Sequence, residues 1–220
     1  MYYINLGKIK KSCNIMKTKK TNNFLISYIL VSILFAIISY FYIDIQLNTA
    51  IENNITDNVK YVAEIITDIG NGKYYYTILI LLILYFYLIN KNKSLLRKVN
   101  FSFLLMLSAN IITYISKFVI GRSRPHMYLS QEKYEFIPFN FNNSYDYASM
   151  PSGHTQTSFT VAVILCTFFP KYKYLFIAIA ILSSLSRVVL SAHWLSDIVI
   201  GAVFGITIPI LIIKKYKDKF

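Results

Sequence analysis

Six long apolar runs divide this 220-residue sequence and constrain its fold more than any other feature. Each is about as long as a helix that crosses a bilayer, which needs roughly 17–25 residues. Open sheet edges and irregular backbone are excluded from hydrocarbon, because their peptide groups would lose water without gaining a partner. The sequence therefore predicts an all-α, integral membrane six-helix bundle. We place the spans near residues 24–43, 74–90, 101–120, 153–169, 172–190 and 194–213.

The composition agrees with a membrane protein and argues against a nucleic-acid partner. Hydrophobic residues make up 55% of the chain, too many for an ordinary soluble domain. The formal net charge of +13 would suit a polyanion, but the lysines cluster in short stretches between the apolar runs. That placement is typical of membrane orientation signals. Membrane lipids are the expected surroundings, and the sequence indicates no obligatory protein partner.

The basic segments alternate with acidic ones and so predict the direction of each span. The N-terminal segment, the loop 91–98, the turn 170–173 and the C-terminal tail are basic, and six spans place all four on one side. The positive-inside rule assigns that side, and hence both termini, to the cytoplasm. We divide the chain into a basic cytoplasmic segment 1–23, a six-span domain 24–213 and a basic cytoplasmic tail 214–220. The richness in Lys, Asn, Ile and Tyr suggests an AT-rich bacterial genome and thus a bacterial inner membrane.

The N-terminal region predicts an uncleaved signal anchor, because no small-residue cleavage site follows the first apolar run. Met16 is an alternative start of translation, in which case the first fifteen residues are an extension outside the protein. Cys13 and Cys166 have a spacing that fits neither a disulfide framework nor a zinc site, so both are expected to be free thiols.

The first outer loop, 44–73, has a pattern of its own. Apolar residues recur at helical spacing from Leu47 to Ile66, with polar residues between them. This predicts an amphipathic helix near 45–68. Two interpretations remain open: the helix lies on the outer membrane surface, or it packs on the bundle.

Charged residues near the ends of spans are the first sign of function, because charge at membrane depth is costly. Lys117 and Arg124 lie seven residues apart, so a continuous helix would place them on one face until Pro125 stops it. The simpler alternative is two side chains that reach the interface independently.

Two further clusters open the fourth and sixth predicted spans. Ser152 is a good helix cap ahead of Gly153 and His154, and free N–H groups at a helix start bind anions. His193 and Asp197 are four residues apart and would share a helix face. A carboxylate beside one imidazole nitrogen fixes the tautomer and leaves the other nitrogen free to react. The alternatives are a plain capped helix and a structural His–Asp pair.

The predicted topology brings three cations, two histidines and one carboxylate to the same outer rim. They are Lys117, Arg124, His154, Arg187, His193 and Asp197. Independent side chains that merely reach for the interface do not explain this mixture. Three fixed cations match the three nonbridging oxygens of a phosphoryl group.

At these positions the sequence resembles the type 2 phosphatidic acid phosphatase superfamily. The family signature is Lys-x6-Arg-Pro, then Pro-Ser-Gly-His, then Ser-Arg-x5-His-x3-Asp, and all three parts stand in order at 117–125, 151–154 and 186–197. Each part is short, but the ordered set is specific. Met150 stands where the family commonly has phenylalanine, a hydrophobic exchange.

The resemblance implies a membrane-embedded phosphatase that hydrolyses a lipid phosphate or lipid pyrophosphate without metal or other cofactor. His193 would attack phosphorus and form a phosphohistidine, Asp197 would orient it, and His154 would protonate the leaving oxygen and later activate water. The phosphate-binding residues implied are Lys117, Arg124, Ser152, Gly153 and Arg187. With this orientation the site faces the periplasm or exterior.

Other functions remain open at this stage. They are a catalytically silent lipid-phosphate binder or transporter of the same fold, a phosphatase for water-soluble esters, and a vanadate-dependent haloperoxidase, whose known forms are soluble. The lipid head group is equally open among phosphatidic acid, phosphatidylglycerophosphate, undecaprenyl pyrophosphate and lipid A phosphates. Aromatic residues in 126–149 are expected to shape the entrance: Tyr128, Phe136, Phe139, Phe141, Tyr145 and Tyr147.

Overall fold

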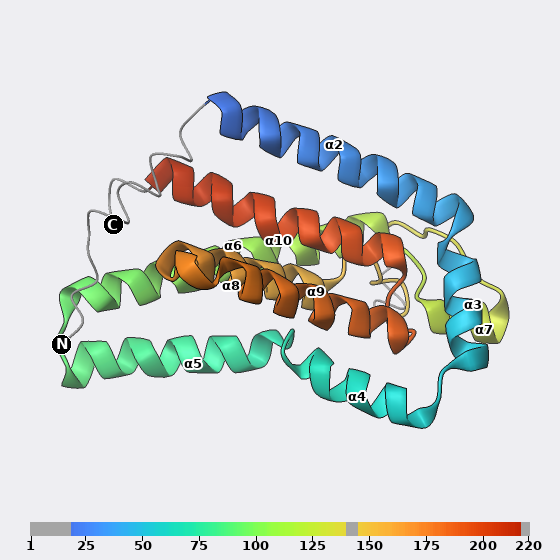
Figure 1. Cartoon of the computed structure of the whole chain (residues 1–220), viewed down its shortest axis with the longest axis horizontal. Coiled ribbons are helices and arrows are strands. Elements are labelled where there is room, and N and C mark those ends of the chain that lie inside the picture. The colour runs from blue at the N-terminus through green and yellow to red at the C-terminus, as the bar shows by residue number, and fades with distance from the viewer. Residues whose placement is uncertain (1–18, 140–144, 217–220) are drawn as a thin grey trace.

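The computed structural model describes residues 19–139 and 145–216, and most of them are helical (Figure 1). Within these two ranges there is one isolated β-bridge, between Arg122 and Phe136, and no strand. The prediction of an all-α chain is therefore confirmed. The sequence-based expectations for residues 1–18, Phe141 and residues 217–220 lie outside the described residues.

Six helices run along the long axis, and each overlaps one of the six apolar runs of the sequence (Figure 1). They are α2 (Lys19–Tyr42), α5 (Gly72–Leu84), α6 (Lys93–Ile120), α8 (Gly153–Phe168), α9 (Lys173–Val189) and α10 (Leu195–Tyr216). A π-helical turn, Tyr85–Ile89, prolongs α5, and a 3-10 turn, Pro170–Tyr172, joins α8 to α9. In the part of the chain that the structure describes, five segments are helical and apolar enough to cross a membrane. α8, with 16 residues, is not one of the five.

α8 is the central helix, and its first half is polar and buried. It packs against α6, α9 and α10. Two glycines of α10 make this close packing possible. A Cβ atom on Gly201 would lie 2.7 Å from the carbonyl oxygen of Ser152, and one on Gly205 would lie 2.5 Å from that of Gln156. The starts of α8 and α10 are thereby held together, and the Ser152 N–H donates to the Asp197 carbonyl oxygen at 3.1 Å.

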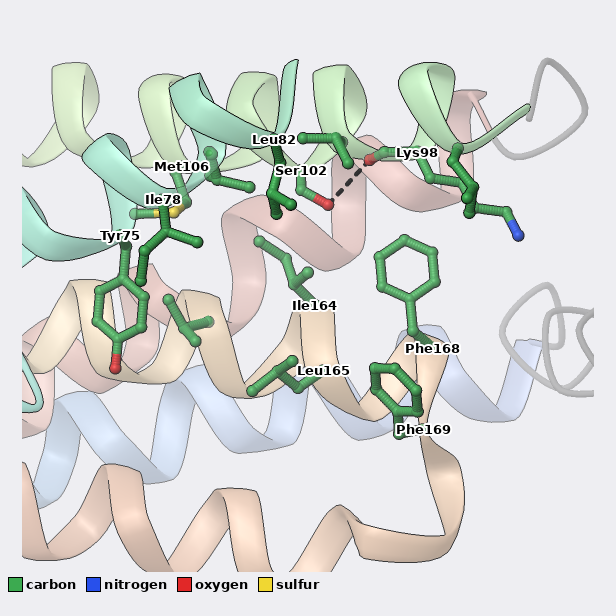
Figure 2. A pocket seen from close by; sticks show the side chains of 14 residues that line it. Tyr75, Ile78, Leu82, Lys98, Ser102, Met106, Ile164, Leu165, Phe168 and Phe169 are labelled. Atoms are coloured by element: carbon green, nitrogen blue, oxygen red, sulfur yellow. Dashed lines mark hydrogen bonds between the residues drawn. The ribbon is translucent and has the colours of Figure 1, made fainter. Parts of the chain in front are cut away.

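The far half of the bundle is apolar. Phe101, Leu105 and Met106 of α6 pack there against Ile164 of α8 and Ile213 of α10. Figure 2 shows a cavity of about 430 Å³ in this half, bounded by α5, α6 and α8, with Lys98 at one edge. Its lining is mostly hydrocarbon, and the hydroxyl of Ser102, one of its few polar groups, donates to the Lys98 carbonyl oxygen at 2.9 Å.

The loop 44–73 forms two helices where one was predicted near 45–68. These are α3 (Asp44–Asn54) and α4 (Asp57–Asp68). The break comes at Ile55, whose backbone is extended, and Thr56 then begins α4. Asn53 and Asn54 are weak helix formers, which explains why the first helix ends there.

α4 packs on the bundle, as one of the two interpretations held. Ala63 is buried, and the Thr67 hydroxyl accepts a hydrogen bond from Arg187 of α9 at 2.9 Å. The other face stays open, with Val62 and Ile65 more than half exposed. The interpretation that the segment lies on the outer membrane surface stays a prediction for this face.

The prediction of one helix from Lys117 to Pro125 is wrong. α6 ends at Ile120, because Gly121 adopts a left-handed conformation (φ 60°) and its N–H caps the Lys117 carbonyl. A Cβ atom there would lie 1.9 Å from the Ile137 carbonyl oxygen, so only glycine fits this turn. Pro125 instead begins the short helix α7 (Pro125–Gln131).

Candidate active site

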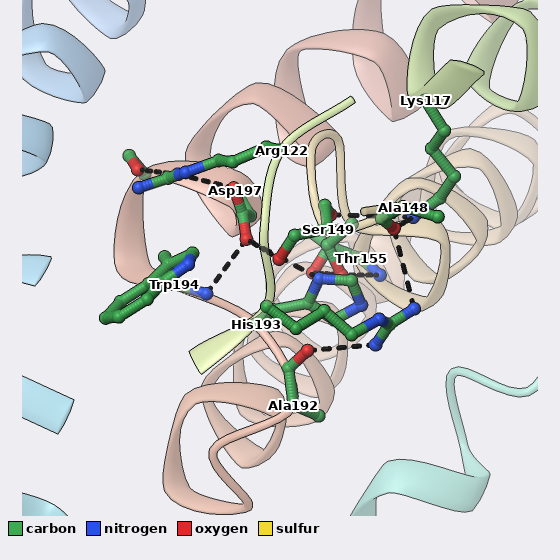
Figure 3. Close-up of polar contacts among 12 residues, drawn as sticks. Lys117, Arg122, Ala148, Ser149, Thr155, Ala192, His193, Trp194 and Asp197 are labelled. Carbon is green, nitrogen blue, oxygen red and sulfur yellow. Dashed lines mark hydrogen bonds and ion pairs between the residues drawn. The ribbon is translucent and has the colours of Figure 1, made fainter. Parts of the chain in front are cut away.

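The residues that the motifs single out meet at one end of the bundle, where α6 and α9 end and α8 and α10 begin (Figures 1 and 3). Lys117 and Arg187 stand in the last turns of α6 and α9, and Asp197 stands in the first turn of α10. His154 is the second residue of α8. The convergence expected from topology is therefore present in the structure.

His193 lies before α10, not on it as the sequence suggested. The turn that carries it is closed by its own N–H and that of Ala192, which both donate to the Arg187 carbonyl oxygen at 3.2 and 3.0 Å. Asp197 reaches back and accepts the Trp194 N–H at 2.9 Å, as an acidic residue does in a capping box. The helix start thus holds Asp197 beside His193.

The pair is buried, and its two side chains face each other. His193 Nδ1 lies 3.6 Å from Asp197 Oδ2, longer than a hydrogen bond, and the two side chains are 3% and 0% exposed. The same oxygen accepts the Ser149 hydroxyl at 2.5 Å. Burial, opposed by Asp197 and reinforced by Lys117 and Arg124, lowers the pKa of His193 well below its usual value. Its imidazole is therefore neutral near pH 7, the form in which one ring nitrogen has a free lone pair.

Three cations lie at the same end of the bundle, and backbone carbonyls or a hydroxyl orient each of them. Lys117 Nζ donates to the Ala148 carbonyl oxygen at 2.5 Å. Arg124 donates to the carbonyls of Tyr145 and Ala192, both at 3.0 Å. Arg187 is held by Thr67, as described above. Lys117 and Arg124 thus both donate to the Ala148 carbonyl oxygen, although they do not share a helix.

The start of α8 completes the cluster. Ser152 is its N-cap, is fully buried, and accepts a hydrogen bond from the Thr155 hydroxyl at 3.2 Å. A Cβ atom on Gly153 would lie 3.8 Å from Lys117 Cε, so the lysine side chain runs past the first turn of α8. The free N–H groups and the positive end of the helix dipole favour an anion at this point.

The sequence reasoning missed a second set of residues behind the His193–Asp197 pair. Arg122 lies within the first motif, and its side chain is 1% exposed and ion-paired with Asp44 and Asp197. Ser149, just before the second motif, also bonds Asp197. The sequence did contain one signal for Asp44: it is an acidic residue at the end of the first predicted span, where charge is costly and often functional. Among the described residues, no group of three or more His, Cys, Asp or Glu side chains is placed to hold a metal ion.

Comparison with known sequences identifies the family. The sequence model of the PAP2 superfamily matches residues 98–220, more than half of the chain. The chain belongs to the PAP2 superfamily. The matched region contains every motif residue from Lys117 to Asp197, so the resemblance noted in the sequence is confirmed.

Two curated relatives are lipid A 1-phosphatases. The protein from Rhizobium johnstonii is 32% identical over 103 residues, and the one from Rhizobium etli is 33% identical over 97 residues. These matches cover 47% and 44% of this chain, and 41% of each relative. The aligned region thus spans about two fifths of the length of the curated relatives.

Two solved structures share the PAP2 fold over most of the chain. A transmembrane PAP2-type phosphatidylglycerolphosphate phosphatase from Bacillus subtilis has a TM-score of 0.63 at 20% identity, covering 89% of this chain and 96% of that one. Aquifex aeolicus LpxE has a TM-score of 0.56 at 20% identity, covering 77% and 93%. At this level of identity the likeness establishes the fold alone.

Proposed function

We propose that this chain is an integral membrane phosphatase that hydrolyses a lipid phosphate or lipid pyrophosphate through a phosphohistidine intermediate. The observation that carries the proposal is the convergence of Lys117, Arg124 and Arg187 on the end of the bundle that holds His193 and Asp197. The PAP2 membership and the two lipid A 1-phosphatase relatives support a lipid substrate.

The first half-reaction transfers the phosphoryl group to His193. Because Nδ1 faces Asp197, Nε2 is the nitrogen that attacks phosphorus. The bond from phosphorus to the leaving oxygen breaks, and His154 gives that oxygen a proton. In the second half-reaction His154 takes a proton from water, water attacks the phosphohistidine, and the P–N bond breaks to release inorganic phosphate.

The cations stabilise the negative charge that spreads over the transferring group. Lys117, Arg124 and Arg187 would bind its nonbridging oxygens, together with the Ser152 hydroxyl and the Gly153 N–H at the start of α8. These groups are fixed before substrate arrives, so little reorganisation is needed in the transition state. The same positive set requires no metal, and we propose a metal-independent reaction.

We further propose six spans with both termini in the cytoplasm. Basic residues stand at the start of α6 (Lys93), at the start of α9 (Lys173) and in the last turn of α10 (Lys214 and Lys215). Figure 1 shows these helix ends at the end of the bundle opposite the site. α8 has 16 residues and is roughly 24 Å long at 1.5 Å per residue. Its neighbours bury most of it, so it can cross the core without matching the full lipid thickness. The site would then face the periplasm or exterior of a bacterial inner membrane.

Cysteine labelling in intact cells tests this orientation. Lys133 and Lys171 are both exposed and lie on opposite ends of the bundle. In a background with Cys13 and Cys166 replaced by serine, Lys133→Cys should react with an impermeant maleimide once any outer membrane is permeabilised. Lys171→Cys should react only after the inner membrane is lysed, and the reverse pattern would refute the proposed topology.

Phosphate release by the purified chain tests the reaction itself. The panel is phosphatidic acid, phosphatidylglycerophosphate, undecaprenyl pyrophosphate, lipid A 1-phosphate and a water-soluble ester such as glucose 6-phosphate. We expect release from at least one lipid, and none from His193→Ala. Release from the soluble ester alone would point to the soluble-ester branch, and tight lipid binding without release would point to a silent binder.

A further inference from the structure

A buried charged layer lies directly behind the His193–Asp197 pair. Arg122 donates through Nη1 to Asp197 Oδ1 at 2.5 Å and through Nη2 to Asp44 Oδ2 at 2.7 Å (Figure 3 shows Arg122 and Asp197). The side chain of Arg122 is 1% exposed, and those of Asp44 and Asp197 are 0% exposed. Asp44 stands at the start of α3, so this layer ties the first outer helix to the start of α10.

The layer is closed by neutral donors and by aromatic rings. Ser196 donates its backbone N–H to Asp44 Oδ1 at 3.1 Å and its hydroxyl to Asp44 Oδ2. Tyr134 donates to the Tyr40 carbonyl at 2.7 Å, and burial raises the pKa of Tyr134, so its hydroxyl stays neutral. The Tyr40 and Tyr134 rings lie 5.1 and 5.3 Å from the Arg122 guanidinium, and excluded water strengthens the charge–charge contacts.

The layer holds more negative than positive charge. Buried charges are costly, and a single carboxylate would suffice to neutralise Arg122. Two carboxylates with one guanidinium leave the layer with a net charge of −1. Asp197 forms the end of the layer that faces His193, which becomes cationic when its Nε2 is phosphorylated while Nδ1 keeps its proton. Lys117 and Arg124 oppose a positive charge on His193, and Asp197 favours it. Asp44 lies behind Asp197, on the other side of the Arg122 guanidinium, and would add to the same effect.

We propose that Asp44 and Arg122 are positioning residues for the reaction: Arg122 fixes the Asp197 carboxylate toward His193, and Asp44 supplies the excess negative charge. Neither residue touches the phosphoryl group. The inference rests on the proposed function, because it assigns the pair a role in forming the phosphohistidine. Lys117, Arg124 and Arg187 would bind the substrate. Changes to Asp44 or Arg122 should therefore alter the rate of the chemical step and not the affinity for the lipid.

Steady-state kinetics of Asp44→Asn test the inference. The substitution keeps the shape of Asp44 and removes its charge. We expect kcat per folded molecule to fall about 10–100-fold, as when the partner that orients a reacting group is lost, while KM for the lipid stays unchanged. Gel filtration in detergent gives the folded fraction. Lys60→Gln is the matched control, because it breaks the exposed Lys60–Glu52 pair at 3.3 Å and should leave kcat and stability unchanged.

A second set of variants separates positioning from folding. Arg122→Met leaves two buried carboxylates without a cation and should unfold readily. Arg122→Met with Asp44→Asn removes one charge of each sign, so the double variant should regain thermal stability relative to Arg122→Met. Its kcat should stay low, because Asp197 has lost the group that fixes it. A double variant that regains both stability and kcat would show a purely structural role and overturn the inference.

The possible results distinguish this inference from the proposed function. A wild-type chain that releases no phosphate from any lipid refutes the proposed function, and the inference falls with it. A wild-type chain that turns over, with Asp44→Asn unchanged in kcat or altered only in KM, refutes the inference alone.

Discussion

A single methyl group added at Gly201 should disturb the candidate active site, because this glycine packs against the start of α8. An added Cβ atom would lie 2.7 Å from the Ser152 carbonyl oxygen and 3.1 Å from Thr155 Cβ. The peptide of Ser152 cannot easily give way, because its N–H is bonded to the Asp197 carbonyl and its side chain caps α8. In Gly201→Ala the two helices must therefore separate.

The size of that separation predicts the effect on rate. Ordinary contact begins near 3.4 Å, so the approach is roughly 0.7 Å too close for an alanine. Asp197 lies one turn from Gly201 on α10, and a shift of this size would carry it away from the start of α8. A misplacement of about 1 Å can cost about 10²-fold in rate, and we expect a loss of that order in kcat. Overpacking costs about 1–3 kcal/mol, of which the better helix propensity of alanine recovers at most about 1 kcal/mol.

The assay compares two glycine variants in detergent. Gly72→Ala is the control, because its Cβ atom would lie 3.5 Å from Thr157 Oγ1, an ordinary contact. Thermal unfolding should show both variants folded at the assay temperature, with Gly72→Ala at wild-type kcat. Wild-type kcat in Gly201→Ala would refute the reasoning that the α8–α10 approach sets the geometry of the site.

Three further outcomes follow from the site. Turnover should persist in chelator and be inhibited by vanadate, whose five-coordinate form resembles the transition state; activity lost in chelator and restored by magnesium would contradict the metal-free reaction. His154→Ala should lose about 10²–10⁴-fold in the rate of lipid hydrolysis. It should still be phosphorylated by nitrophenyl phosphate, whose leaving group needs no proton. Rapid quench should find a persistent phosphohistidine in His154→Ala and none in His193→Ala. Because burial lowers the pKa of His193, the acid limb of kcat/KM, corrected for substrate ionisation, should have its midpoint below the ordinary histidine value of about 6.5; a midpoint above it would contradict a neutral, buried nucleophile.

The helices could be predicted because membrane spans depend on one summed property, the length of apolar sequence. Helix ends depend on single residues and were less predictable. α6 ends before Gly121 and does not continue to Pro125. A glycine in the left-handed conformation whose N–H caps the Lys117 carbonyl ends a helix as effectively as a proline does. Ile55 and Thr56 split the outer amphipathic segment for a similarly local reason. Neither break alters the apolar pattern from which the elements were predicted.

The site could be predicted where its residues sit in short motifs, and not where they depend on distant contacts. Arg122 looks in sequence like one more basic residue near an interface, and its partner Asp44 is 78 residues away. Only the packing of α3 against α7 and the start of α10 brings them together. Ser149 was missed for a different reason. It adjoins a motif, but a serine hydroxyl is too common in sequences to indicate a role by itself.

The direction of each helix also explains the electrostatics of the site. Lys117 and Arg187 stand in the last turns of α6 and α9, where the negative end of the helix dipole favours cations. Asp197 stands in the first turn of α10, beside the start of α8, where free N–H groups favour a carboxylate or a phosphoryl oxygen. Antiparallel neighbours put these ends together, so the up-and-down topology itself places cations around an anion site. Reversing any one of these helices would place the wrong end of its dipole beside the charged side chains at the site. The charge pattern therefore depends on the topology.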